Sequence, residues 1–414
     1  MRRRSPQTGS LQSPSPQPSP GGRGGKGAAS ARNICFVTGT RAEFGLMRSV
    51  LRAIRSHPRL NLHLVVTGMH LDPAHGDGLS AIEREGWKID RVVPWPSGSG
   101  RDRATNARNT GLAVAGLSNA LTELNTEVAL VVGDRVEAFA AATAAYLSGI
   151  AVAHVHGGDR AAGQVDDSLR HAITKLAHVH FPATRQSARR IFQLGEGRWR
   201  IIRAGSPGLD GILTAAAPPR EVKQSVGALT RGRFALLVLH PMDADEQLER
   251  RRAKTILKCV AGVPFEQIVI VYPNNDPGAV GIMRCWESIA AEGDGGRFRA
   301  HRDLRREVYL GLLRDAAVLV GNSSSGIIEA ASFGTPVIDI GPRQYGRERG
   351  KNVVNVPYSE LRINRELRRL WNGGRPRRFK ADNIYGGEGA GRIIASALAR
   401  ISLNDRLFRK IIRY

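Results

Sequence analysis

Cysteine and aromatic residues are scarce in this chain. Its 414 residues include three scattered cysteines, Cys35, Cys259 and Cys285, and only 6% aromatic residues. An odd number of scattered cysteines argues against a disulfide framework and against a zinc cluster, so we expect a protein of the reducing cytoplasm. The aromatic residues are too few for the stacking surface of a single-strand nucleic-acid binder.

Long hydrophobic runs are also missing. The longest apolar stretches have the length of a β-strand, which excludes a membrane-spanning helix. The Arg-rich N-terminus is not followed by an apolar segment, so it does not match a secretory signal. We therefore expect no membrane partner.

Acidic residues are few beside basic ones, with 37 Asp and Glu against 61 Lys and Arg and a net charge of +24. Such a charge is typical of nucleic-acid binders. Here the positive charges are mostly arginines spread along the chain, and the sequence has no recognition-helix or RNA-binding signature. We expect no nucleic-acid partner, because a small polyanionic substrate needs only a few of these arginines.

The length and a hydrophobic content of 42% predict two domains. The N-terminal segment consists mostly of Pro, Gly, Ser and Arg and cannot pack a core. A Gly- and Pro-rich stretch at 206–220 is typical of a domain boundary. The predicted parts are a disordered extension at 1–32, a first lobe at 33–206, a second lobe at 207–385 and a C-terminal helix and tail at 386–414.

Short apolar runs alternate with helix-sized stretches in both lobes. The predicted strands lie at 33–38, 61–68, 128–133, 150–157, 177–183, 199–205, 234–241, 267–273, 316–322, 335–341 and 352–356. An Ala-rich helix is predicted over 138–147, and a last helix over 390–403 could pack back on the first lobe. Strands alternating with helices predict parallel sheets with right-handed crossovers. The fold class is α/β, with two Rossmann-like lobes facing a central cleft where a ligand would lie at the carboxyl ends of both sheets.

The segment GTRAEFG, residues 39–45, is a predicted strand-to-helix turn that carries Arg41. Its backbone N–H groups and guanidinium could bind an oxyanion. Taken alone, the segment is better explained as an ordinary loop with a solvent-exposed arginine.

The segment GNSSSGIIEAASFGTPVIDIG, residues 321–341, is more specific. Ser323, Ser324 and Ser325 stand between two glycines at the end of a predicted strand, which is more than a simple helix cap requires. We predict that the following helix N-terminus holds two phosphates without a metal or other cofactor. Glu329 is a candidate acceptor for ribose hydroxyls. Downstream, at least one of three arginines is expected to neutralise the diphosphate: Arg343, Arg347 and Arg349.

Carboxylates and histidines gather after two strands of the first lobe. Asp134 and Arg135 follow one strand, and the segment 154–175 holds the rest: His154, His156, Asp159, Asp166, Asp167 and His171. Two histidines on one strand face could suggest metal ligands, but no Cys or third paired His completes a site, so we expect none. One of Asp166 and Asp167 is expected to cap the helix SLRHAITK. In the second lobe, His240 follows the first strand and is placed to touch phosphate or sugar.

These segments resemble the hydrolysing UDP-N-acetylglucosamine 2-epimerases of sialic-acid and legionaminic-acid biosynthesis. The resemblance runs from about Ile34 to about Gly391 and is carried by VTGTRAEFGL, TGMHLD, VVGDRVEA, HVHGGDRAAGQVDDSLRHAITKLAHVHF, AGSPGLD, GNSSSGIIEAASFGTPVIDIG and RQYGRERGKNVVNV. It implies a fold like that of the GT-B glycosyltransferases, with UDP held mainly by the second lobe. It also implies a UDP-sugar substrate, no cofactor and a homo-oligomer, dimer or tetramer.

The resemblance also implies roles for single residues. Contacts on the diphosphate and uridine side fall on Arg41, Arg135 and Arg343, phosphate ligands on Ser323 and Ser324, and the ribose ligand on Glu329. Catalytic positions fall on Asp134, Asp166 and His240, and His70 falls near the substrate. Two departures concern the acid and base: some relatives have a catalytic glutamate where His156 stands and GGE where Asp159 stands. The missing carboxylate's role could pass to either residue.

The implied chemistry is loss of UDP with removal of the C2 proton, followed by addition of water to a 2-acetamidoglucal. The acid and base candidates are Asp134, Asp166, Asp159 and His156, and their crowding should raise the pKa of at least one. Three alternatives remain: a non-hydrolysing epimerase, a GT-B glycosyltransferase, and a protein that binds nucleotide-sugars or nucleic acid without turnover.

Overall fold

The computed structural model of the chain describes residues 31–72, 77–95, 103–160, 165–273, 276–292, 296–302, 304–411 and 413. The side chains of 103, 165, 166 and 289–292 lie outside this description. The predicted extension at 1–32 therefore lies almost wholly outside the described residues. No helix in the described ranges is long and apolar enough to span a membrane.

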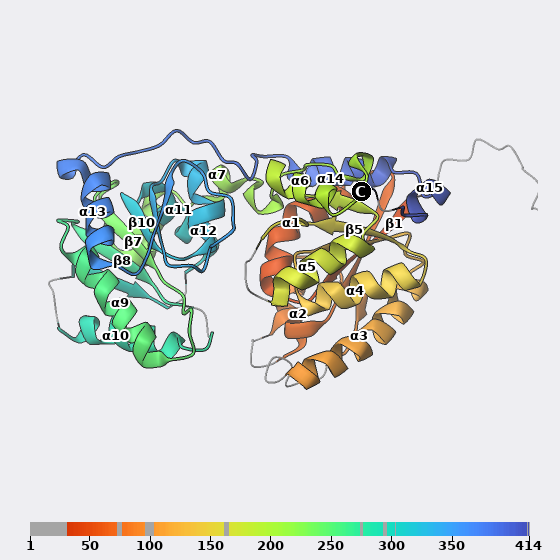
Figure 1. The fold of residues 1–414 in the computed structure, drawn as a ribbon, viewed down its shortest axis with the longest axis horizontal. Coiled ribbons are helices and arrows are strands. Elements are labelled where there is room, and N and C mark those ends of the chain that lie inside the picture. Colours follow the sequence, from red (N-terminus) through yellow and green to blue (C-terminus); the bar gives the residue numbers. More distant parts are fainter. Residues whose placement is uncertain are drawn as a thin grey trace, which may run out of the picture. The chain divides into compact units, whose positions relative to one another are not determined.

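The first sheet has six parallel strands in the order β3-β2-β1-β4-β5-β6. Figure 1 labels two of them, β1 and β5, with helices around them. The strands are β1 (Arg32–Thr38), β2 (Leu60–Val66), β3 (Arg91–Val92), β4 (Val128–Val132), β5 (Ala151–Val155) and β6 (Val179–Phe181). The associated helices are α1 (Arg41–Arg55), η1 (Gly68–Leu71), α2 (Gly78–Arg84), α3 (Arg103–Glu123), α4 (Val136–Leu147), α5 (Val165–Leu176), α6 (Arg185–Gln193) and η3 (Arg198–Arg200).

The second sheet repeats this plan in the order β12-β11-β10-β7-β8-β9. Its strands are β7 (Phe234–Val238), β8 (Gln267–Val271), β9 (Phe298–His301), β10 (Val318–Gly321), β11 (Val337–Ile340) and β12 (Val353–Val356). Its helices are α8 (Pro219–Val226), α9 (Glu246–Ala261), α10 (Ala279–Glu292), α11 (Arg306–Asp315), α12 (Ser324–Ile328), η5 (Ala330–Phe333), α13 (Glu360–Trp371) and η6 (Asn372–Gly374). The predicted fold class, α/β with two Rossmann-like lobes, is confirmed.

Both faces of each sheet are buried, which is why the strands are apolar throughout. In β4, Val128, Leu130 and Val132 pack on the side of α1, while Ala129 and Val131 pack on the side of α3 and α4. The second sheet is covered by α9, α10 and α13 on one face and by α8 and α11 on the other. These layers leave the carboxyl ends of the strands as the open edge of each sheet.

Two short segments connect the lobes. The first contains η4 (Pro207–Leu209) and α7 (Ile212–Ala215), and the second leads from residue 385 into α14 (Ala390–Arg400) and α15 (Asp405–Phe408). Helix α14 packs on α1 in the first-lobe core. Both oxygens of Asp210 accept the first backbone N–H groups of this helix: 2.7 Å from Gly389, 2.9 Å from Ala390 and 2.7 Å from Gly391.

Several predicted boundaries were wrong. The segment 199–205 is no sheet strand, since it forms η3 and a single bridge from Ile201 to His180. Buried Arg200 also ties the segment to the carbonyls of His178 and Arg406, at 3.0 and 2.9 Å, and the Ile202 amide donates to the His180 carbonyl at 2.9 Å. The short edge strands β3 and β9 were not predicted, because their half-exposed residues give no apolar run.

The helix after the first strand begins at Arg41, inside the predicted turn. Thr40 is its N-cap and forms a reciprocal capping box with Glu43. In the same way, α5 begins at Val165, which places Asp166 and Asp167 inside the helix rather than ahead of it. The helix that begins within the serines, α12, is only five residues long, and the 3-10 helix η5 follows it.

Candidate active site

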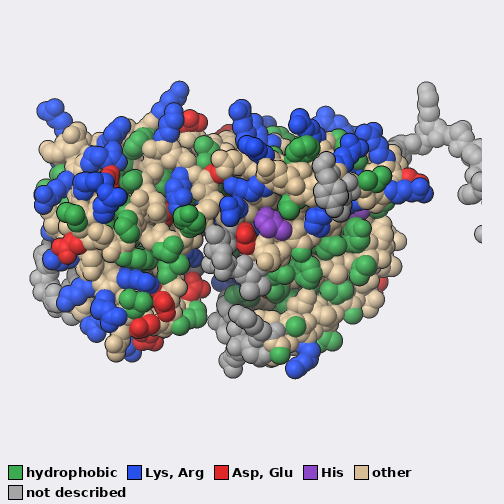
Figure 2. Space-filling view, in the orientation of Figure 1, with side chains coloured by type: hydrophobic (Ala, Val, Ile, Leu, Met, Phe, Trp, Pro, Cys, Tyr) green, Lys and Arg blue, Asp and Glu red, His purple; other side chains and the backbone are tan. Residues whose placement is uncertain are grey.

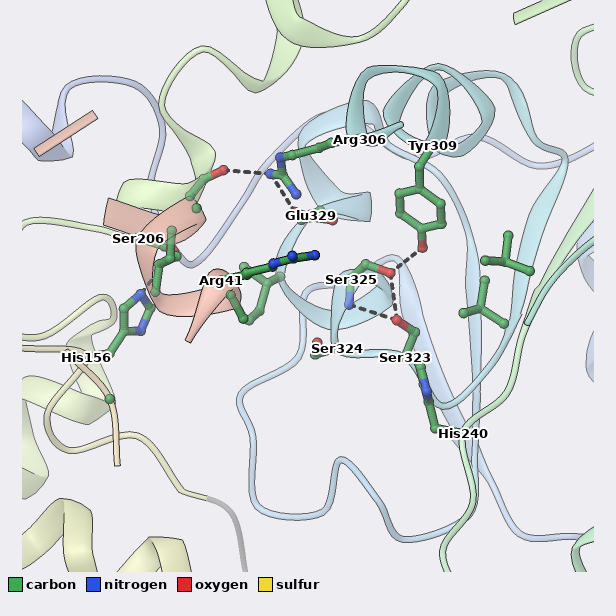
Figure 3. Close-up of a pocket in the computed structure, with 18 of the residues that line it drawn as sticks. Arg41, His156, Ser206, His240, Arg306, Tyr309, Ser323, Ser324, Ser325 and Glu329 are labelled. Carbon is green, nitrogen blue, oxygen red and sulfur yellow. Dashed lines mark hydrogen bonds and ion pairs between the residues drawn. The ribbon is translucent and has the colours of Figure 1, made fainter. Parts of the chain in front are cut away.

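The carboxyl ends of the two sheets line one cavity of about 720 Å³, a size suited to a small-molecule ligand. Nine of the predicted site residues line it: Arg41, Asp134, His156, Asp159, His240, Ser323, Ser324, Glu329 and Arg347. The close-up in Figure 3 shows Arg41 and His156 on one side of this cavity and His240, Ser323 and Glu329 on the other. On the face visible in Figure 2, by contrast, Lys and Arg side chains are spread widely rather than gathered in one patch.

Three predicted residues are not part of the lining: His70, Arg135 and Arg343. His70 is buried, and its Nε2 is 3.2 Å from the Thr38 hydroxyl. Arg135 faces Glu137, with 3.4 Å from Nε to a carboxylate oxygen. Arg343 donates to the Asn322 carbonyl at 3.3 Å. The side chain of Asp166 lies outside the described residues, so its predicted role stays a prediction.

The first-lobe half of the cavity is built around buried Arg170 on α5. Its guanidinium forms an ion pair with Asp134 and lies 4.0 Å from Asp159. It also donates to the carbonyl of His156 at 3.3 Å. One arginine therefore holds together the ends of β4 and β5, from which the acid and base candidates project.

Asp159 is held on both carboxylate oxygens. One is 2.9 Å from Nδ1 of His156, and the other accepts the Ser187 hydroxyl at 2.6 Å. Burial raises the pKa of Asp159, but the hydrogen bond and charge of His156 and the charge of Arg170 outweigh burial and lower it to about 2. Asp159 is therefore a carboxylate at neutral pH.

Crowding of the pocket carboxylates was expected to raise the pKa of at least one of them. Asp159 is not that group, because a histidine and an arginine face it. A carboxyl group with a raised pKa lies outside the cavity lining. Burial and the charge of Glu137 raise the pKa of Glu43 to about 8, despite a hydrogen bond from the Gly39 amide. Sequence analysis did not single out Glu43 or Glu137.

In the second lobe, His240 stands at the end of β7 beside the end of β10. The side chain of Asn322 holds its backbone, and the Asn322 carbonyl accepts Gln344 Nε2 at 2.9 Å. Burial and, to a smaller extent, the charge of Arg343 lower the pKa of His240 to about 4. His240 is therefore a neutral hydrogen-bonding group at neutral pH rather than a cationic phosphate ligand.

The serines form a hydrogen-bonded chain. Ser323 is the N-cap of α12, as predicted, with its hydroxyl 2.9 Å from that of Ser325 and accepting the Ser325 amide at 3.3 Å. The hydroxyl of half-buried Tyr309 contacts Ser325 as well. Gly321 precedes them with a φ of +136°, and a Cβ there would lie 1.9 Å from the Val238 carbonyl oxygen, so only glycine fits.

Glu329 is bound by an arginine that sequence analysis did not identify. Arg306 on α11 forms an ion pair of 2.8 Å with Glu329 and donates to the carbonyl of Gly208 in the linker at 3.2 Å. Figure 3 shows both contacts. A residue proposed to bind ribose is thus tied to the segment that joins the lobes.

Two lining arginines differ from the others in their partners. Arg170, Arg302 and Arg306 each pair with a carboxylate. Arg41 in the first lobe and Arg347 in the second form no ion pair with any described residue. They supply positive charge to the cavity from both sides. Within the described ranges, no three His, Cys, Asp or Glu side chains form a metal-binding group.

Sequence reasoning missed Arg170, Ser206, Arg306 and Tyr309. For Arg170 a signal existed, since it lies one helical turn after Asp166 and Asp167. Arg306 and Tyr309 carry no local signal, because α11 meets the serines only through the tertiary fold. Ser206 lay in a stretch interpreted as a linker.

The chain is similar in sequence to known proteins over most of its length. A family model described as UDP-N-acetylglucosamine 2-epimerase matches residues 52–399. A UDP-N,N'-diacetylbacillosamine 2-epimerase (hydrolyzing) from Legionella pneumophila is 34% identical over 384 residues, 92% of this chain and 100% of that protein. A UDP-N-acetylglucosamine 2-epimerase from Neisseria meningitidis is 34% identical over 356 residues, 86% of this chain and 91% of that protein.

Solved structures share the fold. The UDP-GlcNAc 2-epimerase from Neisseria meningitidis bound to UDP-GlcNAc superposes with a TM-score of 0.75 at 18% identity, over 89% of this chain and 100% of that one. The enzyme from Methanocaldococcus jannaschii in complex with UDP-GlcNAc and UDP gives a TM-score of 0.69 at 16% identity, over 88% and 99% of the two chains.

Proposed function

We propose that this chain, which belongs to the UDP-N-acetylglucosamine 2-epimerase family, converts a UDP-linked 2-acetamido sugar into the free 2-epimer and UDP. The observation that carries the proposal is one cavity with two chemically different halves. The first-lobe half holds the candidate acid and base groups, and the serines and Arg347 of the second-lobe half, together with Arg41, suit a diphosphate.

The chemistry requires both halves. The C2 proton of a 2-acetamido sugar becomes removable only as the C1–O bond to UDP breaks and positive charge develops at C1. Fixed positive charge stabilises the departing diphosphate most in a site that excludes water. We assign this task to Arg41, Arg347 and the serine hydroxyls, because α12 is too short for its dipole to suffice.

Proton transfer falls to the first-lobe half. We propose elimination of UDP to a 2-acetamidoglucal, after which water adds at C1 and a proton reaches C2 on the opposite face. Inversion at C2 needs groups on both faces of the sugar. Asp134, His156 and Asp166 are our candidates, with His240 beside the leaving group and Glu329 on the ribose.

The two relatives named above leave the sugar open. One is named for a diacetamido substrate and one for UDP-N-acetylglucosamine, and this chain is 34% identical to both. Either sugar carries the 2-acetamido group on which the proposed chemistry depends.

The test is incubation with each UDP-sugar in deuterated water, with free UDP assayed and the sugar followed by NMR. We expect release of free UDP and deuterium at C2 of a free 2-epimer. Deuterium incorporation with UDP still attached would instead indicate a non-hydrolysing epimerase. A UDP-sugar consumed only when an acceptor is added would indicate a glycosyltransferase, and tight binding without turnover a sensor.

We also propose, from family resemblance alone, a dimer or tetramer that works in the cytoplasm. Light scattering after size-exclusion chromatography tests the assembly, and fractionation of the cells that make the protein tests the compartment. A monomer at micromolar concentration would contradict the first proposal.

A further inference from the structure

His156 has an unusual backbone conformation. Its φ is +61°, and it is the only residue in the described ranges other than Gly and Asn with a positive φ in the left-handed region. Such a conformation is unfavourable for a non-glycine residue and persists only where the surroundings impose it. Two hydrogen bonds hold this conformation: the His156 amide donates to the Phe181 carbonyl at 3.1 Å, and Arg170 donates to the His156 carbonyl at 3.3 Å.

This backbone directs both ring nitrogens of His156 at fixed partners. Nδ1 is 2.9 Å from an Asp159 oxygen, and Nε2 is 3.1 Å from the hydroxyl of Ser206. Figure 3 shows His156 and Ser206 facing each other. Because Asp159 is ionised at neutral pH, it can only accept, so Nδ1 carries a proton in every state of the ring. Nε2 of the neutral ring must then accept the Ser206 proton.

Ser206 reaches this position from outside the first lobe's sheet. It opens the linker between the lobes, its amide donates to the Tyr385 carbonyl at 2.8 Å and its carbonyl accepts the Leu209 amide at 3.0 Å. The residue is fully buried yet forms part of the cavity wall beside His156. The linker thus supplies the partner that β5 and its loop do not.

We propose that Ser206 is a positioning residue for His156, completing an Asp159–His156–Ser206 array that fixes the orientation and the tautomer of the ring at the cavity wall. The role of this array in turnover rests on the proposed function, whereas its geometry does not. A hydroxyl can donate to Nε2 of the neutral ring and accept from Nε2–H of the charged ring, so one serine serves both states. The Nδ1 proton stays on the ring throughout, and the Asp159 carboxylate balances the added charge.

The kinetic test is a double-mutant cycle. Ser206→Ala should lower kcat by about 10- to 100-fold, as loss of an orienting partner does at other sites, while KM changes by less than about threefold. Combined with His156→Asn, which tolerates the positive φ, Ser206→Ala should change kcat by less than about twofold further. Equal losses from Ser206→Ala in both backgrounds, or wild-type kcat in the single variant, would overturn the proposal.

Two further variants separate this role from linker stability. Ser49→Ala removes a hydroxyl that donates to the Pro207 carbonyl of the same linker at 3.1 Å but lies outside the cavity lining, and its kcat should stay within about twofold of wild type. Ser206→Thr keeps the hydroxyl and should recover kcat to within about fivefold. A threonine variant that folds with the wild-type melting temperature but is as slow as the alanine variant would contradict the assignment.

A measurement without turnover distinguishes failure of this inference from failure of the proposed function. The ¹⁵N NMR spectrum of labelled histidine, taken at a pH where the His156 ring is neutral, should show the Nδ1–H tautomer in wild type and a mixture in Ser206→Ala. A dominant Nε2–H tautomer in wild type would refute the array. If wild type shows the Nδ1–H form but releases UDP from no UDP-sugar, the array stands and the proposed function fails.

Discussion

The side chain of Asn322 holds the backbone of His240 at both of its polar groups. Its Oδ1 accepts the His240 amide at 2.7 Å, and its Nδ2 donates to the His240 carbonyl at 2.8 Å. The two residues follow neighbouring strands of the second sheet, β10 and β7, so the pair locks two strand ends together. The asparagine next to the serines is thus a support for the cavity wall rather than a ligand.

Asn322→Asp should destabilise the protein and impair turnover together. Aspartate keeps the acceptor but removes the Asn322 hydrogen bond to the buried His240 carbonyl, which costs about 1–3 kcal/mol of unfolding free energy. Urea unfolding measures this loss. Asn61→Asp, a matched change at an exposed position, should alter the unfolding free energy little. An unchanged urea midpoint for Asn322→Asp would contradict the role assigned to this pair.

Arg41 and Arg48 both line the cavity on α1 but should differ in their effect on UDP binding. Arg48 is paired with Glu85, with 2.7 Å from Nε to a carboxylate oxygen, whereas Arg41 has no such described partner. Arg41→Ala should weaken UDP binding by about 10- to 100-fold, the size of a lost charge-assisted hydrogen bond. Arg48→Ala should weaken it by less than about threefold. Isothermal titration calorimetry would measure both, and equal losses would show that cavity charge, not Arg41 itself, matters.

Asp134→Asn should abolish product formation and leave UDP affinity nearly intact. Asp134 lies on the acid–base side of the cavity and pairs with Arg170, away from the serines. Turnover should fall by about 10²- to 10⁴-fold, the usual contribution of a positioned acid or base. Free-UDP release and UDP titration would be measured on the same sample. Near-normal turnover in this variant would remove Asp134 from the list of acid and base candidates.

Glu43 should make stability depend on pH. Its pKa rises from 4.5 in the unfolded chain to about 8 in the folded protein, because it is buried beside Glu137, with Asp134 and Arg135 as further charged neighbours. Below pH 4.5 the raised pKa makes its full contribution to the free energy of unfolding. This contribution is lost as the pH rises to 8, at up to about 1.4 kcal/mol per pH unit. Glu43→Gln keeps an acceptor for the backbone amides and should flatten that slope.

Urea unfolding at several pH values between 5 and 8 would test the role of Glu43. Glu123→Gln, at an exposed carboxylate paired with Arg91, should leave the wild-type slope in place. If the slope survives in Glu43→Gln, another buried group is responsible.

Asp210 should matter for the return of α14 to the first lobe. Its carboxylate accepts three backbone N–H groups at the start of that helix, so Asp210→Ala should cost about 0.5–2 kcal/mol, the usual value of an N-cap. Hydrogen exchange across 390–400 should speed up in the same variant. Asp210→Asn keeps one acceptor oxygen and should lose less. Wild-type protection in Asp210→Ala would show that packing on α1 alone holds the helix.

Local patterns in the sequence predicted most of the secondary structure. The runs 128–132 and 234–238 are apolar at every position because both faces of their strands are buried. Where an element depended on contacts distant in the sequence, the hydrophobic pattern either did not predict it or predicted the wrong element. Segment 199–205 looks like a strand, but it forms only a single bridge to β6, and its arginine donates to carbonyls elsewhere. The capping signal T-x-x-E at 40–43 was readable and would have placed the start of α1 correctly.

By itself, the sequence determined two α/β lobes with polar residues after their strands, because strand and helix periodicity and parallel crossovers depend on near neighbours in the chain. Only the tertiary structure decided how those polar groups are partnered. Ser206 meets His156 across 50 residues and Arg170 meets Asp134 across 36. Which groups become hydrogen-bond partners depends on where the crossovers and linkers return the chain. The spacing of residues along the sequence does not specify that geometry.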